Sequence, residues 1–193
     1  MFEELSLHIL DLAMNSIAAK ARTVQIMIAE HARRDRLSIR IQDNGHGMDA
    51  DTLKRVLADQ TTTKRSRKKN IGLGLALLRQ TAEMCGGELH VRSTPAVGTT
   101  VTASMKLSHV DRPPLGDLNA TILALCAANP VVDVQLHYLT DTDHFHFSSK
   151  QPAEKKVAGP EGLRGKEKTN YEPGRTQKVE REGTAAGCLA GRQ

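Results

Sequence analysis

The chain has 193 residues, of which 39% are hydrophobic and 25% charged, a composition typical of one globular domain with an appendage. No apolar run is long enough to cross a bilayer, and the acidic start lacks the basic residues of a signal peptide. Three widely spaced cysteines form no CxxC pair, which argues against a disulfide framework or a zinc site and favours a cytoplasmic location.

The net charge of +5 is concentrated in the last part of the chain. Residues 150–193 hold 10 basic and 6 acidic side chains, whereas residues 1–149 hold 17 and 16. The basic cluster at 64–69 has no interleaved aromatic residues, so a nucleic-acid partner is not expected. Residues 150–193 also lack periodicity, hold Tyr171 as their one aromatic residue and are rich in Lys, Glu, Gly and Pro, which predicts a disordered basic tail.

Periodicity in the sequence predicts alternating helices and strands. The segment 59–71 has neither a period nor apolar anchors, and we predict a loop there. Helices are expected over 5–21, 50–58, 73–85 and 116–128, and strands over 24–28, 37–41, 88–93, 99–107, 131–139 and 143–148.

The first motif is a polar pair on the opening helix. Asp11 and Asn15 lie four residues apart, so they face the same side of that helix. An amide oxygen can ligate Mg²⁺, and a carboxylate one turn away can accept a proton from a water molecule. Taken alone, the pair is better explained as an ordinary solvent-facing polar stripe, because two-residue matches of this kind are common.

The second motif, Asp43-x-Gly45-x-Gly47, directly follows an expected strand. A carboxylate at a strand end can accept a hydrogen bond from the exocyclic amine of adenine. The two glycines let the backbone bend close to a flat ring. These residues are also ordinary turn formers, so a plain turn is the alternative.

The third motif places Gly72 and Gly74 at the start of the helix expected over 73–85. Backbone N–H groups and the positive end of a helix favour phosphate. The segment lacks the third glycine of a dinucleotide-binding fingerprint and the Gly-Lys-Thr ending of a Walker loop.

In this order and spacing, the three motifs resemble those of the GHKL superfamily of gyrase, chaperone, histidine kinase and MutL ATPases. The resemblance covers about residues 5–107. It implies the Bergerat fold, an α/β sandwich of a mixed sheet with helices on one face, and it implies ATP and Mg²⁺ as ligands. The matched positions are Asp11 and Asn15 for the N box, Asp43, Gly45 and Gly47 for the first glycine box, Gly72, Gly74 and Leu75 for the second, and Gly98-Thr99 for a late Gly-Thr pair.

The resemblance also assigns roles to single residues. It implies Asp11 as the catalytic base, Asn15 as the Mg²⁺ ligand and Thr99 as a residue that helps hold the water linked to the adenine. The loop between the glycine boxes corresponds to the ATP lid, where Lys64 would meet the γ-phosphate. For the neighbouring basic residues 65–69, a solvated charge run is an equal alternative.

Two departures from the family bear on activity. Relatives that hydrolyse ATP usually carry Glu where this chain has Asp11. Histidine kinases often carry Lys three residues after the magnesium Asn, where this chain has Ala18. Only seven residues precede His8, so we expect no two-helix phosphoacceptor domain and disfavour a sensor kinase acting alone.

We therefore expect an ATP-binding domain over 1–110, an αββ extension packed on it over 111–149, and the tail over 150–193. The leading hypothesis is a cytoplasmic Mg-ATP-binding switch or protein-kinase-like regulator that acts on a protein partner, with a homodimer as one option and no membrane association. The alternatives are a slow ATPase with ATP-driven lid ordering, and a non-catalytic module that senses ATP against ADP. His144 and His146 share a strand face, and in sequence no third metal ligand accompanies them.

Overall fold

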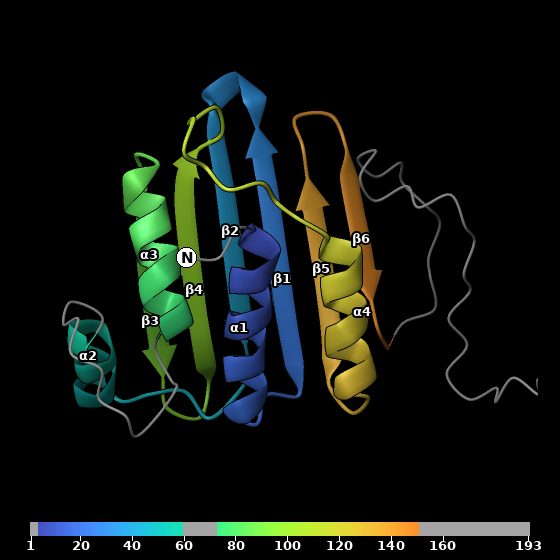
Figure 1. Cartoon of the computed structure of the whole chain (residues 1–193). Helices are drawn as coiled ribbons and strands as arrows, with labels where there is room; N and C mark the ends of the chain where they lie inside the picture. Colours follow the sequence, from blue (N-terminus) through green and yellow to red (C-terminus); the bar gives the residue numbers. More distant parts are fainter. Residues whose placement is uncertain (1–3, 60–72, 151–193) are drawn as a thin grey trace, which may run out of the picture.

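The protein is described by a computed structural model over residues 4–59 and 73–150. Six strands form one sheet in the order β3-β4-β2-β1-β5-β6. Helices α1, α3 and α4 lie against one face of this sheet (Figure 1). The elements are α1 (Leu5–Ala18), β1 (Thr23–His31), η1 (Ala32–Arg34), β2 (Arg36–Asp43), α2 (Ala50–Asp59), α3 (Leu73–Met84), β3 (Glu88–Thr94), β4 (Gly98–Lys106), α4 (Leu118–Ala128), β5 (Asp133–Leu139) and β6 (His144–Ser148).

The sheet is mixed because one of its strand pairings is parallel. Strands β1 and β2, β2 and β4, β3 and β4, and β5 and β6 pair antiparallel. Strand β5 pairs parallel with β1, in a register that sets Val24 beside Val134. A parallel neighbour needs a crossover connection, and helix α4 is part of it. The predicted fold class, a mixed sheet with helices on one face, is confirmed.

The core lies between the sheet and the helices. Alternate residues of the central strands point toward the helices, as the period of two requires. Leu5, Ile9 and Leu12 of α1 meet them along one face of the helix. The fully buried strand residues include Val24, Ile26 and Ile28 of β1, Leu37 and Ile39 of β2, Ala103 of β4 and Val134 of β5.

Helix α1 ends at Ala18, three residues before the predicted end. Lys20 has a positive φ of 62°, which turns the chain out of the helix. Ala21 is nevertheless buried, with 5% of its surface exposed. The apolar pattern therefore continues to Ala21, three residues beyond the last helical residue, and this is why the predicted boundary was wrong.

The segment after β4 is tied to the beginning of α1. The backbone N–H groups of Leu5 and Ser6 donate to the carbonyl oxygens of Pro114 and Leu115, both at 2.9 Å. These bonds satisfy two of the N–H groups that a helix start leaves free. The chain then continues into α4, which begins at Leu118 with Asp117 accepting a hydrogen bond from the N–H of Ala120. The domain boundaries at 110 and 149 stay a prediction.

Two further expectations concern the ends of the chain and membranes. The expected disordered tail lies outside the described residues, except for Lys150. Among the helices that the structure describes, none is long and apolar enough to span a membrane.

Burial of His8 in α1 makes stability depend on pH. His8 is fully buried, and burial lowers its pKa from 6.5 to about 4. The unfolded chain therefore binds a proton more readily than the folded chain at intermediate pH. We expect the free energy of unfolding to be highest above pH 6.5 and to fall as the pH drops toward 4, by at most about 3 kcal/mol.

Denaturant titrations of the wild type and His8→Asn at several pH values test this expectation. The variant removes the titrating group, so its stability should change less between pH 6.5 and pH 4. Parallel pH profiles for the two proteins would show that other groups cause the acid sensitivity.

Candidate functional site

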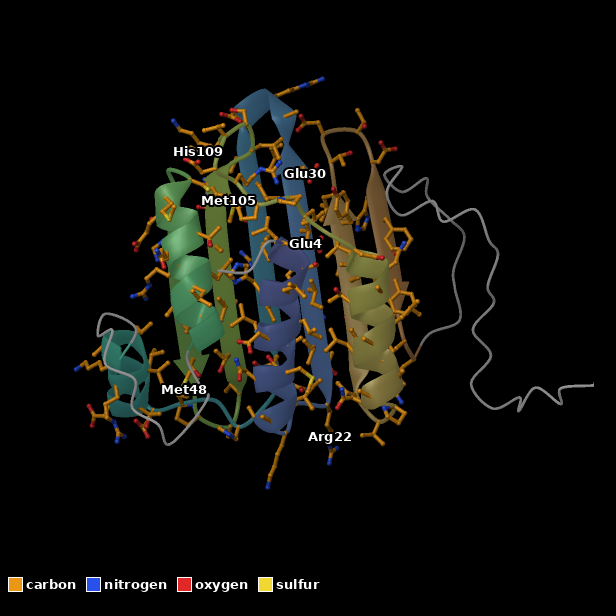
Figure 2. The ribbon with its side chains drawn as sticks, in the orientation of Figure 1. Glu4, Arg22, Glu30, Met48, Met105 and His109 are labelled. Carbon is orange, nitrogen blue, oxygen red and sulfur yellow. The ribbon has the colours of Figure 1, made fainter. Side chains whose placement is uncertain are left out.

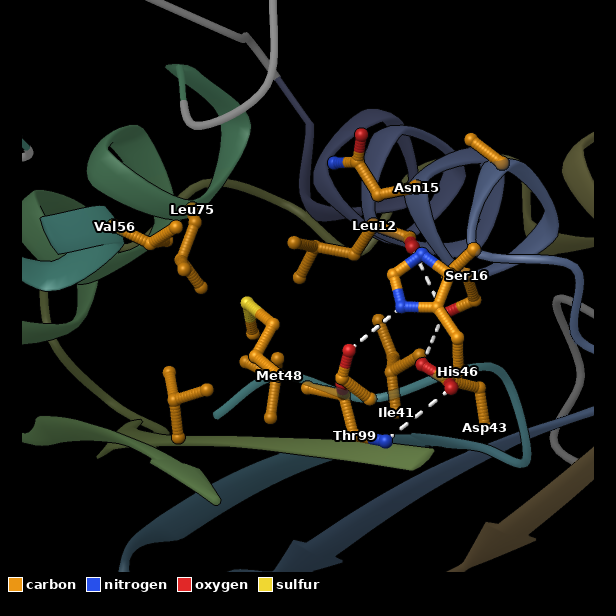
Figure 3. A pocket seen from close by; sticks show the side chains of 15 residues that line it. Leu12, Asn15, Ser16, Ile41, Asp43, His46, Met48, Val56, Leu75 and Thr99 are labelled. Carbon is orange, nitrogen blue, oxygen red and sulfur yellow. Dashed lines mark hydrogen bonds between the residues drawn. The ribbon is translucent and has the colours of Figure 1, made fainter. Parts of the chain in front are cut away.

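A pocket opens between α1 and the ends of the strands β2 and β4, with α2 and α3 on its far side (Figure 3). It lies at the end of the molecule marked by Met48 and Arg22, opposite the end marked by His109 and Glu30 (Figure 2). Its lining residues are Leu12, Asn15, Ser16, Ala18, Ala19, Ile41, Asp43, His46, Gly47, Met48, Val56, Leu75, Val91, Thr99 and Val101.

Asp43 forms the polar end of the pocket. The residue is 9% exposed, and its carboxylate accepts three hydrogen bonds. One oxygen, Oδ1, accepts from the N–H groups of Gly45 at 2.9 Å and Thr99 at 3.2 Å. The other oxygen accepts from the hydroxyl of Ser16 at 2.9 Å. These bonds fix the carboxylate and leave acceptor capacity for a further donor.

A second set of hydrogen bonds holds the floor of the pocket beside Asp43. The hydroxyls of Ser93 and Thr99 lie 2.9 Å apart, and the Ser93 hydroxyl also donates to the carbonyl of Gly98 at 3.3 Å. The same Ser93 oxygen accepts from the N–H of Met48 at 2.8 Å. The chain after Asp43 is thereby fastened to the β3–β4 turn.

The predicted polar pair of α1 lies next to the start of α3. The amide Nδ2 of Asn15 donates to Oδ2 of Asp11 at 3.3 Å. A Cβ on Gly74 would stand 1.8 Å from that same oxygen, so this position accepts no larger residue while Asp11 keeps its place. Burial raises the pKa of Asp11, and the hydrogen bond from Asn15 opposes this rise.

The structure brings most of the predicted site residues together. Asn15, Asp43, Gly47 and Thr99 line the pocket, and Gly45 lies beneath it against Ala19. Asp11 and Gly74 lie close together, since a Cβ on Gly74 would clash with the Asp11 carboxylate, and neither lines the pocket. Lys64 and Gly72 lie outside the described residues, as does the rest of the predicted lid.

Sequence reasoning missed three residues that line the pocket, Ser16, His46 and Met48, and one that supports it from β3, Ser93. Ser16 is next to Asn15 but reads as an ordinary helix residue, since its partner Asp43 is 27 positions away. His46 and Met48 stand between and after the motif glycines, at positions without an obvious chemical signal. Ser93 was assigned only to a strand, although its alternation with Val91 places it on the helix-facing side of β3.

The middle of the pocket is apolar and its two ends are polar. Ile41, Met48 and Leu75 contribute to an apolar slot that suits a flat aromatic ring. The Asp43 end offers a buried acceptor, and the Asn15 end offers an amide beside the first turn of α3. Such an arrangement can bind an aromatic base that carries an amine, with an anionic group toward the helix.

No group of three His, Cys, Asp or Glu side chains among the described residues has the arrangement of a metal site. The pair His144 and His146 gains a neighbour in His137 of β5. The rings of His137 and His144 stack with their centroids 5.8 Å apart, and the ring of His146 lies tilted against His137 with a centroid distance of 4.4 Å. Burial and the two neighbouring rings lower the pKa of His137.

Residues 2–109 match the family described as "Histidine kinase-, DNA gyrase B-, and HSP90-like ATPase". Since this match covers more than half of the chain, the protein belongs to that family. It is an ATP-binding domain of the GHKL type, similar to those of histidine kinases.

Individual relatives agree with this classification. The chain is 26% identical over 94 residues to "Sensor histidine kinase YvrG" of Bacillus subtilis, covering 48% of this chain and 16% of that protein. It is 30% identical over 99 residues to "Histidine protein kinase DivJ" of Caulobacter vibrioides, covering 50% of this chain and 17% of that protein. The chain thus spans less than a fifth of the length of these relatives.

A solved structure has the same fold. The "Crystal Structure of N terminal domain of a DNA repair protein" superposes with a TM-score of 0.52 and 18% sequence identity. The superposition covers 76% of this chain and 52% of the other.

Proposed function

We propose that this protein binds Mg-ATP in the pocket of Asp43 and acts as a nucleotide-dependent regulator of a protein partner. The observation that carries the proposal is the Asp43 carboxylate, buried and held by three hydrogen bonds at the end of an apolar slot. A fixed acceptor in such a place suits the exocyclic amine of adenine.

In this proposal the phosphates extend from the slot toward Asn15 and the start of α3. Mg²⁺ prefers hard oxygen ligands and keeps several waters, so the amide oxygen of Asn15 would supply one ligand. The Nδ2 group of Asn15 is turned toward Asp11, which leaves its oxygen for another partner. The other residues proposed to contact the phosphates are Gly74 and two residues outside the described ranges, Lys64 and Gly72.

Replacing Asn15 by alanine tests the metal assignment. We expect Asn15→Ala to weaken Mg-dependent ATP binding by about ten- to a hundredfold, because a hydrogen bond or ligand to a charged group contributes about 1.5–3 kcal/mol. Calorimetry with ATP in Mg²⁺ and in EDTA measures this effect. Asn129→Ala is a matched control, since Asn129 ends α4 outside the pocket. An unchanged affinity for Mg-ATP would remove Asn15 from the site.

The proposed output is a switch on a partner, with protein-kinase-like transfer as one form of it. The support is the similarity to histidine kinases, whose remaining length this chain does not span. Incubating the full chain with ATP labelled at the γ-phosphate, with and without proteins that copurify, separates the options. Label on a protein supports kinase-like transfer, label in free phosphate supports hydrolysis, and label left on ATP supports a sensor without turnover.

A slow ATPase is the second candidate, and Asp11 is the residue that favours it. Burial raises the pKa of its carboxyl, which moves the group toward the range useful for a general base. In the proposed mechanism, Asp11 accepts the proton of the water that attacks the γ-phosphate. Asp reaches about one methylene less far than Glu, so we expect slow turnover.

The variant Asp11→Asn separates this candidate from the sensor. We expect phosphate release to fall by about a hundredfold or more, since general-base catalysis typically contributes about 10²- to 10⁴-fold, while ATP affinity stays close to the wild type. A phosphate-release assay under saturating Mg-ATP measures the rate. Asp11→Glu should accelerate release if the carboxyl already faces the water. If neither variant changes the rate, Asp11 is not the base.

A further inference from the structure

His46 lies at the rim of the pocket, between the two glycines of the Asp43 motif. Its side chain is among the lining residues and is exposed to solvent. Figure 3 shows its imidazole on the same side of the pocket as Asp43, with the ring turned up toward the helix of Ser16 and Asn15. Asp43 lies deeper, because only 9% of its surface is exposed.

Three hydrogen bonds hold His46 in place. Its backbone N–H donates to the carbonyl of Ala19 at 2.9 Å, and its own carbonyl accepts from the N–H of Ala96 at 2.8 Å. Its ring nitrogen Nδ1 lies 2.6 Å from the carbonyl oxygen of Gly47. Helix α1 and the β3–β4 turn therefore clamp the backbone, and the third bond orients the ring.

The bond to Gly47 also decides which ring nitrogen carries the hydrogen. A carbonyl oxygen only accepts, so Nδ1 must donate, and in the neutral imidazole the lone pair is then on Nε2. Nε2 of His46 is therefore a hydrogen-bond acceptor at the rim of the pocket, and it suits a ligand group that donates a hydrogen bond. Phosphate oxygens only accept and would meet the Nε2 lone pair unfavourably, whereas hydroxyl groups donate.

The positions of Asp43 deep in the pocket and of His46 at its rim indicate which hydroxyl of a nucleotide meets His46. This step rests on the proposed function, in which the adenine amine meets Asp43. The amine and the sugar attach to opposite sides of the purine, so a base seated on Asp43 directs its sugar toward the rim. We propose that His46 is a further nucleotide-binding residue, whose Nε2 accepts a hydrogen bond from a ribose hydroxyl and so favours ribonucleotides over deoxyribonucleotides.

The test combines a change in the protein with a change in the ligand. Calorimetry measures the affinities of the full chain for ATP, 2′-deoxy-ATP and 3′-deoxy-ATP, in the wild type and in His46→Ala. We expect removal of one of the two hydroxyls to weaken binding to the wild type by about three- to tenfold, the range of a single hydrogen bond. In His46→Ala that loss should disappear, because the partner of the hydroxyl is gone.

Two further variants keep the result specific. His46→Phe retains a planar ring without Nε2, and it should behave as His46→Ala. His90→Ala is the matched control, because His90 is an exposed histidine of β3 outside the pocket, paired with Glu88. This control should bind all three nucleotides as the wild type does.

The outcomes separate this inference from the proposed function. If the wild type binds no ATP, the proposed function fails and the inference with it. If the wild type binds all three nucleotides equally, or if His46→Ala loses affinity for each by the same factor, the ribose contact is wrong while ATP binding stands. If His46→Phe binds the three nucleotides with the same affinities as the wild type, the ring acts by packing, which also overturns the proposal.

Discussion

Replacing Asp43 by alanine should lower the affinity for ATP by about a thousandfold. The carboxylate is the buried acceptor at the end of the slot, and its loss leaves the adenine amine without a partner. It also removes the acceptor of Ser16, Gly45 and Thr99. Several unpaired polar groups in a closed site together account for about 4 kcal/mol, which corresponds to this factor.

The variant Asp43→Asn tests the same assignment through base specificity. Guanine carries a carbonyl oxygen where adenine carries its amine, so the wild type should bind GTP far more weakly than ATP. The side-chain amide that this substitution introduces can donate a hydrogen bond, which should narrow the gap between the two nucleotides.

Calorimetry with ATP and GTP measures both effects, and thermal unfolding checks that the variants fold. Asp35→Asn is the control, because Asp35 accepts hydrogen bonds from Ser108 far from the pocket. Equal affinity of the wild type for ATP and GTP would contradict the role of Asp43.

Local pattern predicted the elements well where burial alternates along the chain. Leu37, Ile39 and Ile41 alternate with polar residues, and all three are buried in β2. The short 3-10 helix Ala32–Arg34 was not predicted, because its residues lack an apolar period and the turn depends on a positive φ of 48° at Asp35.

The pairing of strands that lie far apart in sequence could be determined only from the structure. Strand-like residues at 131–139 were expected to extend the sheet, but the sequence does not say that Val134 lies beside Val24 in a parallel pairing. Register depends on contacts between segments more than 100 residues apart, and a local pattern carries no information about them.

In the candidate site, too, the residues recognised by their sequence neighbours were predicted, and the residues defined by contacts between distant segments were missed. Asp43 was identified by its place at a strand end before two glycines, and those are neighbours in sequence. Ser16 and Ser93 were missed because their bonds to Asp43, Thr99 and Met48 join separate elements. His46 was passed over because its role depends on a ring orientation that the carbonyl of Gly47 sets.

Replacing Gly47 by alanine should destabilise the fold by more than about 4 kcal/mol. Gly47 has a positive φ of 64°, which alone disfavours other residues by about 1–2 kcal/mol. In addition, a Cβ at this position would stand 2.0 Å from the carbonyl oxygen of Thr94. That oxygen belongs to the backbone at the end of β3, so a backbone shift would be needed to relieve the contact.

Gly86 offers a matched control for the steric part of this effect. Its φ of 69° is nearly the same, but a Cβ there would meet the Lys106 side chain at 3.4 Å, an ordinary contact. Gly86→Ala should therefore lower the free energy of unfolding by about 1–2 kcal/mol and leave ATP binding unchanged, because it lies outside the pocket. Denaturant unfolding of both variants, with ATP affinity measured in parallel, separates backbone strain from the clash. Equal destabilisation by the two substitutions would show that the close approach of Gly47 to Thr94 contributes nothing.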